Sequence, residues 1–339
     1  MRNMKLHSWF RHVFSSCCRF FCKKRLWKRE LVENPLCVIM VDGGFCSVLV
    51  KFALGLAIAR DRNVTVKYDL SWFHSKGVGC DGHSNREFTL TQAFPAVNLE
   101  EATEDEIYWT KKIHYQKNQF PFVFDASHLT PKSKYLDGYF YHWKYLDLVK
   151  AELFRLLRFD ELELDDENES VKNHITQSRN SIAIHVRRGD FISVGNAILT
   201  PDYYLSALSF LVAKRELKDP AVFFFSDDPE WVRESIVGWI PEGYDVQCVD
   251  VNDQSKGFLD LYLISLCKYQ ISSNSSFGVW GGFLNQDVDK EVIIPSVWYD
   301  ASKERRSLEG HAEAFRMPGW TVFSVDEHCV VEDSFCSNG

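Results

Sequence analysis

The stretch IAIHVRRGDF, residues 182–191, begins as an apolar strand and ends in charged side chains. A short run of branched apolar residues is typical of a strand buried in a parallel sheet. Two adjacent arginines, Arg187 and Arg188, are costly to hold at such a strand end unless an anion neutralises them. Guanidinium groups donate in a fork that matches phosphate oxygens, and their charge stabilises a nucleoside diphosphate as it leaves. We therefore expect both to bind a diphosphate, with Asp190 bracing one of them; the alternative is an Arg–Asp surface network.

His185 precedes this arginine pair on the same predicted strand. Because side chains alternate along a strand, His185 points to the same side as Arg187. Its imidazole would hydrogen-bond a nucleotide base or phosphate, or act as a general base. A histidine that is merely satisfied in the core is the alternative.

A second motif, FFFSDDPEW at residues 223–231, ends an apolar segment in Asp227 and Asp228. One of the two carboxylates is expected to cap the helix that Pro229 opens. The other can accept hydrogen bonds from guanine N1–H and N2–H₂, an edge that asks for a carboxylate. Capping alone is the alternative.

A third motif, SSNSSF at residues 272–277, places small hydroxyl residues before a predicted helix. The unpaired N–H groups and the positive dipole end of a helix N-terminus form an anion site. Ser275, Ser276 and Phe277 are therefore predicted phosphate contacts, unless the serines act only as caps.

Apolar strands and helical stretches alternate around residues 182–191. The predicted strands of this region are 181–186, 221–225, 245–249, 269–272 and 291–294. Such alternation predicts a parallel, doubly wound sheet, which binds ligands at the carboxyl ends of its strands. Earlier in the chain, the apolar run 36–41 is followed by Gly43-Gly44 and an apolar helical stretch at 48–59. This second strand–turn–helix unit would let a ligand approach the backbone at the two glycines.

Charge divides the chain further. Residues 1–29 contain nine Lys or Arg and no acid, whereas residues 160–169 contain seven acids. We divide the chain into a basic aromatic arm (1–30), an N-terminal α/β domain (36–159), an acidic linker (160–180) and a C-terminal domain (181–320).

The composition excludes several classes of protein. Beyond the arm, 30 basic and 47 acidic side chains give a charge of −17, which argues against a nucleic-acid binder. The ten cysteines form no CxxC pair and have no histidines at zinc-ligand spacing, which favours a reducing compartment. The DxD at 287–289 reads as solvated surface, so we expect no metal ion and no cofactor.

The arm has no membrane-spanning segment, because its longest uncharged run is seven residues, from 12 to 18, against about 20 for a spanning helix. Residues 5–29 interleave aromatic and basic side chains and would suit an anionic membrane interface. A basic helix packed on the acidic body is the alternative.

With these residues in view, the chain resembles the α-1,2-fucosyltransferases (glycosyltransferase family 11-like), and more loosely the α-1,6- and protein O-fucosyltransferases. The stretches that carry the resemblance are HVRRGD at 185–190, FSDDPEW at 225–231, NSSFGVWGGFLN at 274–285 and YLDGYFYHWKYL at 135–146. The resemblance implies an α/β, GT-B-like fold of two Rossmann-like domains with a donor-binding cleft between them.

The resemblance also implies a reaction: metal-independent displacement, with inversion, of L-fucose from GDP-fucose onto the 2-hydroxyl of a terminal galactose on a glycan. The C-terminal domain would bind the nucleotide sugar, and the N-terminal domain would lie on the acceptor side. Arg187 and Arg188 would hold the β-phosphate and act in catalysis, His185 and one of Asp227 or Asp228 would contact guanine, and residues 275–277 would close on the pyrophosphate.

The chain departs from this family at the glycine loop. Where the family typically has GGLGNQMFQYA, residues 43–53 read GGFCSVLVKFA. The third glycine is Cys46, and an Asn-Gln pair is replaced by Ser47-Val48. These amides could contact donor phosphate or acceptor, so a catalytically altered GDP-sugar-binding relative is one alternative. The same fold acting on another GDP-sugar is a second.

We expect an enzyme of the bacterial cytoplasm, peripheral at the inner membrane if the arm binds there. The sequence does not rank the candidate general bases, which are Asp42, His74, His83, Glu87 and His142.

The membrane alternative makes a direct prediction for residues 1–30. A peptide of this sequence should co-sediment with vesicles of anionic lipid at low salt, and added salt should release it because screening weakens the attraction. Absence of binding at low salt would remove the membrane alternative.

Overall fold

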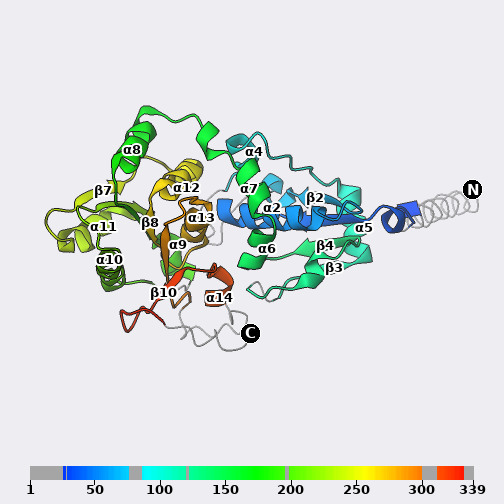
Figure 1. Cartoon of the computed structure of the whole chain (residues 1–339). Coiled ribbons are helices and arrows are strands. Elements are labelled where there is room, and N and C mark those ends of the chain that lie inside the picture. The colour runs from blue at the N-terminus through cyan, green and yellow to red at the C-terminus, as the bar shows by residue number, and fades with distance from the viewer. Residues whose placement is uncertain are drawn as a thin grey trace, which may run out of the picture.

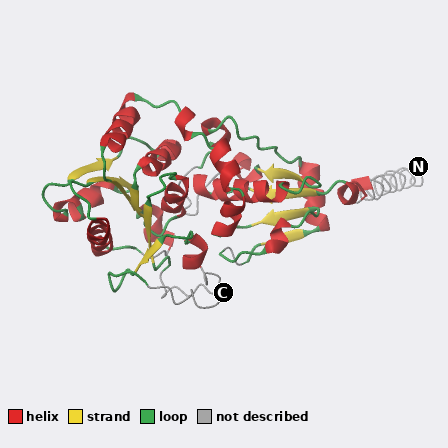
Figure 2. Ribbon diagram, viewed as in Figure 1, coloured by secondary structure: helices red, strands yellow, loops and turns green. Residues whose placement is uncertain are grey.

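Two parallel β-sheets lie side by side in the computed structural model, each flanked by helices (Figures 1 and 2). The structure describes residues 26–27, 29–75, 86–119, 122–194, 198–299 and 311–331. Most of the arm and the candidate base His83 lie outside the described residues. No helix in these ranges is long and apolar enough to span a membrane.

The first sheet has the strand order β2-β1-β4-β3, with all pairs parallel. Its strands are β1 (Leu36–Met40), β2 (Thr65–Asp69), β3 (Tyr115–Lys117) and β4 (Lys134–Asp137). The helices around it are α2 (Phe45–Ala59), α3 (Ser71–Ser75), α4 (Leu90–Ala93), α5 (Glu104–Ile113), α6 (Trp143–Leu148) and α7 (Lys150–Leu156). The 3₁₀ turns of this half are η1 (Ala126–Leu129) and η2 (Phe159–Glu161).

The second sheet has the order β10-β9-β8-β5-β6-β7, again with all pairs parallel. Its strands are β5 (Ser181–Val186), β6 (Ala221–Ser226), β7 (Asp245–Val249), β8 (Tyr269–Ile271), β9 (Glu291–Pro295) and β10 (Thr321–Phe323). The helices are α8 (Asp166–Gln177), α9 (Gly189–Val194), α10 (Pro201–Arg215), α11 (Pro229–Ser235), α12 (Gly257–Leu266), α13 (Ser276–Leu284) and α14 (His311–Phe315). The 3₁₀ turns are η3 (Val237–Trp239) and η4 (Gln254–Lys256).

This arrangement confirms the expected α/β fold with two parallel sheets. β5 is buried along its whole length, as its apolar composition predicts for a central parallel strand. β10 pairs with β9 and extends the sheet three residues beyond the predicted domain end at residue 320.

The acidic segment at 160–169 contains the start of helix α8. Asp165 caps α8 by accepting a hydrogen bond from the backbone N–H of Asn168 at 3.0 Å. The Asn168 side chain is fully buried and hydrogen-bonds to Asn252. The chain therefore begins a packed helix within the acidic run, and the Asn-x-Ser triplet at this position has no exposed amide.

The two halves share one hydrophobic core, which includes residues of α2, α12, α13 and β9. Phe45 at the start of α2 faces Phe258 of α12, with ring centroids 6.2 Å apart. Phe159 stacks on Tyr262 at 5.8 Å. The first contact holds the first turn of α2 against α12, and the second holds η2 against the same helix.

A buried ion pair anchors the glycine turn beneath this contact. Lys51 of α2 is 1% exposed, and its ammonium group donates to the Asp42 carbonyl at 3.3 Å and contacts the Asp42 carboxylate. It also lies 4.6 Å from the centre of the Tyr139 ring. Burial lowers the pKa of Lys51, while the charges of Asp42 and Asp137 oppose that shift.

We expect the two members of this pair to differ in their effect on stability. Asp42→Ala should lower the free energy of unfolding by roughly 3–5 kcal/mol, because it leaves the buried ammonium unpaired. Lys51→Met should cost less, since the Asp42 carboxylate is 22% exposed and can be hydrated. The double variant should recover most of the loss. Urea unfolding measures all three, and an Asp42→Ala variant no less stable than the double variant would contradict the assignment.

Candidate functional site

The three predicted motifs meet at one point of the second sheet. β5 lies between β6 and β8, so the chain builds the sheet outward from β5 first on one side and then on the other. Val186 pairs with Ser226 of β6, and Ile184 pairs with Ile271 of β8. Loops that leave adjacent strands in opposite directions open a crevice at the strands' carboxyl ends, which is where such sheets bind ligands. The predicted site residues of the C-terminal half lie at this switch point.

Arg187 is held between two carboxylates. Its Nη2 donates to Asp190 Oδ1 at 2.8 Å, and its Nη1 lies 3.1 Å from Asp227 Oδ2. The Arg187 side chain is 23% exposed, so it reaches the surface only in part. Because two carboxylates contact the Arg187 guanidinium, the direction in which its remaining N–H groups point is fixed.

Arg188 is oriented by different partners. Its backbone N–H donates to Asp227 Oδ1 at 2.9 Å, and its Nε donates to Asp228 Oδ2 at 3.1 Å. The guanidinium lies 3.9 Å from the centre of the Trp231 ring, a cation–π contact. Asp190 and Asp227 thus brace Arg187, and Asp227 and Asp228 brace Arg188.

Gly189 makes this bracing possible. A β-carbon at this position would lie 2.5 Å from Asp227 Oδ2, closer than any tolerated contact. The absence of a side chain lets the β6 loop approach the backbone of the β5 loop. A side chain at residue 189 would therefore displace the Asp227 carboxylate that contacts Arg187.

Both aspartates of the second motif already have protein donors. Asp228 is the N-cap of α11 and accepts from the Trp231 N–H at 3.2 Å, as expected for one of the pair. Each of the four carboxylate oxygens of Asp227 and Asp228 accepts an N–H group or contacts a guanidinium. The guanine contact of either residue stays a prediction, and the observed contacts give both a bracing role.

His185 is buried at the end of β5. Its Nδ1 lies 2.9 Å from Ser273 Oγ, and its ring stacks on Phe277 at 5.3 Å. Burial, reinforced by the positive charge of Arg187, lowers the pKa of His185 to about 3. The imidazole is therefore neutral at physiological pH, and it links β5 to the helix that follows β8.

The N-terminus of α13 supplies the third motif. Ser275 caps the helix by accepting from the Phe277 N–H at 3.3 Å, and Ser276 is partly exposed beside it. Gly278 packs directly under this turn, where a β-carbon would lie 2.0 Å from Ser272 Oγ. Ser275 thus acts as a cap, and Phe277 contacts His185; their phosphate contacts remain predictions.

The glycine turn of the first sheet lies opposite these loops. Gly43 has a φ of +84°, a conformation that favours glycine, and the turn follows β1 at the switch point between β1 and β4. The charge of Arg187 acts on the buried Cys46 thiol, whose pKa burial raises. Arg86, which the sequence analysis did not single out, lies between Gly44 and Asp190.

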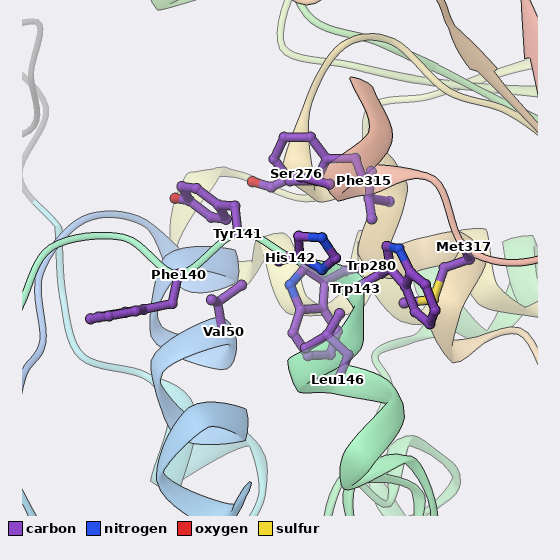
Figure 3. Close-up of a pocket in the computed structure, with 12 residues that line it drawn as sticks. Val50, Phe140, Tyr141, His142, Trp143, Leu146, Ser276, Trp280, Phe315 and Met317 are labelled. Carbon is purple, nitrogen blue, oxygen red and sulfur yellow. The ribbon is translucent and has the colours of Figure 1, made fainter. Parts of the chain in front are cut away.

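A separate, small aromatic pocket lies between the two halves. Figure 3 shows side chains of α2, α6, α13 and α14 converging on it, among them Trp280 and Phe315, together with Tyr141 from the loop before α6. Of the predicted donor-site residues, Ser276 alone lines this pocket. The arginine cluster lies outside the pocket, so the two features are distinct.

The remaining candidates are scattered. His142 lines the aromatic pocket, caps α6 through Nδ1 at 3.2 Å from the Lys144 N–H, and has its pKa lowered by burial to about 4. His74 is exposed beside Glu101, and Glu87 is exposed. The DxD at 287–289 forms an exposed turn in which Asp287 accepts from the Asp289 N–H. Within the described residues, no cluster of His, Cys, Asp or Glu could hold a metal ion.

Fold and site together define an α/β protein of two parallel sheets with a braced arginine pair at a switch point. The sequence model described as Glycosyl transferase family 11 matches residues 103–324. The chain therefore belongs to glycosyl transferase family 11 and is a glycosyltransferase of the fucosyltransferase family.

Individual relatives are more distant. An alpha-1,2-colitosyltransferase of Escherichia coli is 25% identical over 289 residues, covering 78% of this chain and 92% of the relative. A galactoside 2-alpha-L-fucosyltransferase of Caenorhabditis elegans is 28% identical over 184 residues, 51% of this chain and 48% of the relative. The NodZ alpha-1,6-fucosyltransferase soaked with GDP-fucose matches with a TM-score of 0.40 and 15% identity, over 74% of this chain and 92% of that chain.

The buried imidazole predicts a pH dependence of stability. The pKa of His185 is about 3 in the folded protein and near 6.5 when unfolded, so between these values the unfolded state binds an extra proton. Stability should therefore fall as pH drops below 6.5, with a slope of up to ~1.4 kcal/mol per pH unit from this group. His185→Gln should remove that slope in urea unfolding measured between pH 7 and pH 4.

His174 should contribute a pH dependence of stability with the opposite sign. Hydrogen bonds to Asp245 and Gln247 overcome a desolvation effect and raise the pKa of this partly exposed imidazole. Its stabilisation is present at low pH and is lost as pH rises through the folded pKa. An unchanged pH dependence in His185→Gln would contradict a neutral, buried His185.

Proposed function

We propose that this chain transfers L-fucose from GDP-fucose to the 2-hydroxyl of a terminal galactose on a glycan, with inversion and without a metal ion. The observation that carries the proposal is the arginine pair at the β5 end, braced by three aspartates where a doubly wound sheet binds its ligand. Family membership supports a sugar transferase, and the resemblance supplies donor and linkage.

The leaving group of such a reaction is a nucleoside diphosphate, which gains negative charge as the glycosidic bond breaks. Arg187 and Arg188 are fixed before the donor arrives, so they stabilise that charge with little reorganisation. The N-terminus of α13 adds backbone N–H groups and the positive end of a helix dipole. These features take over the role that a metal ion has in other diphosphate sites.

In this proposal, neutral His185 contributes by position. Its ring is held by Ser273 and Phe277, so it ties the arginine loop to the α13 turn. Asp190, Asp227 and Asp228 orient the guanidinium groups toward the donor. The acceptor approaches from the N-terminal half.

The colitosyltransferase relative favours a second candidate, the same reaction with another GDP-sugar. Its match extends over most of both chains, whereas the galactoside fucosyltransferase matches over about half. A binding-only relative is the third candidate. Its support is the glycine loop, where Ser47 and Val48 replace the family's two amide side chains. Val48 is 3% exposed, and Ser47 Oγ hydrogen-bonds to Tyr141 at 2.6 Å, so both side chains are engaged within the protein.

The assay is incubation of a panel of β-galactosides with GDP-fucose or, in parallel reactions, with other GDP-sugars, followed by detection of GDP and product. Arg187→Ala and Arg188→Ala should each lower kcat by roughly 10²-fold or more, the usual effect of losing a donor to a developing anion. Arg155→Ala is the matched control, since this exposed arginine of α7 pairs only locally with Glu152.

Each outcome of the assay separates the candidates. Transfer that persists undiminished in both site variants would contradict the mechanism. Transfer from a different GDP-sugar alone would select the second candidate. Binding of GDP-fucose without transfer to any acceptor would select the binding-only relative.

A further inference from the structure

Arg86 brings a third guanidinium to the arginine cluster from the other half of the protein. Its Nη2 lies 3.9 Å from Asp190 Oδ2, and its side chain is 24% exposed. The other oxygen of the same carboxylate, Oδ1, accepts from Arg187 at 2.8 Å. One aspartate therefore lies between two arginines that come from different sheets' loops.

The contact of Arg86 with Asp190 is loose. At 3.9 Å the two groups attract electrostatically but are beyond hydrogen-bond distance. Arg187, by contrast, is hydrogen-bonded to that carboxylate. An anionic ligand could therefore accept hydrogen bonds from Arg86 without breaking a short contact within the protein.

Arg86 also lies against the glycine turn. A β-carbon on Gly44 would be 3.8 Å from Arg86 Nη1, so the guanidinium covers the bare backbone of this turn. The side chains that follow it point elsewhere: Cys46 is 6% exposed, and Ser47 bonds to Tyr141. The glycine turn itself has no cationic side chain, and Arg86 places one beside it.

The charges on the two sides of the crevice point to one ligand chemistry. Three arginines (86, 187 and 188) face three aspartates (190, 227 and 228), and α13 adds a helix N-terminus. A diphosphate offers several oxygens in different directions, so arginines on opposite walls can bind it together. A single phosphate offers fewer.

We propose that Arg86 is a further binding residue for the donor diphosphate, exchanging its loose contact with Asp190 for an oxygen of the β-phosphate and joining the glycine turn to the arginine pair. This inference rests on the proposed function, because the donor is taken to be a nucleoside diphosphate sugar. The competing role is an ion pair that only holds the two halves together.

Titration calorimetry with GDP and GMP separates these roles. Loss of a charged hydrogen bond should weaken GDP binding by about 10- to 100-fold in Arg86→Ala. GMP affinity should change by less than about threefold, because GMP lacks the second phosphate that Arg86 is expected to contact. Arg86→Lys should lie between wild type and Arg86→Ala, since it keeps the charge and loses the planar fork.

Arg155→Ala is again the control and should bind both nucleotides as the wild type does. If Arg86→Ala fails to fold, Arg86→Gln gives the same comparison with a neutral side chain that keeps hydrogen-bonding capacity. Equal losses for GDP and GMP, or no loss for either, would overturn the inference while leaving the proposed function intact. A wild-type protein that does not bind GDP would overturn the proposed function itself.

Discussion

Two guanidinium groups leave the end of a strand whose six residues are all buried, and the site depends on how their charge is balanced. Three carboxylates from the loops after β5 and β6 do this, and the bare backbone of Gly189 gives one of them room. Because the arginines are oriented before any ligand arrives, the site is preorganised for an anion. The aspartates keep the cluster stable without ligand and position the guanidinium groups for phosphate.

The topology explains why both halves contribute. Each sheet has a switch point at its first strand, β1 or β5, and each switch point is followed by a glycine-containing turn. The shared core around α2 and α13 holds these two turns near each other. Lys51 and Asp42 anchor the turn of the first half from below, so its altered side chains pack inward and leave backbone at the crevice.

The local patterns in the sequence predicted β1, most of α2 and five strands of the second sheet, whereas β2, β3, β4 and the contacts between distant elements required the structure. The bounds 181–186 of β5 and the proline-led, Asp228-capped start of α11 follow from the apolar run and the cap. The bracing of both arginines by Asp227 depends on residues about 40 positions apart, and Arg86 meets Asp190 across 104 positions. No periodicity encodes such pairs. β10 was not among the predicted strands.

A crystal structure of the protein with GDP would show directly whether the arginines at the end of β5 hold the diphosphate of a GDP-sugar. We expect the β-phosphate oxygens within about 3 Å of guanidinium nitrogens of Arg187 or Arg188 and beside the N-terminus of α13. A well-ordered GDP whose phosphates lie away from both arginines, for example in the aromatic pocket around Tyr141 and Phe315, would contradict it.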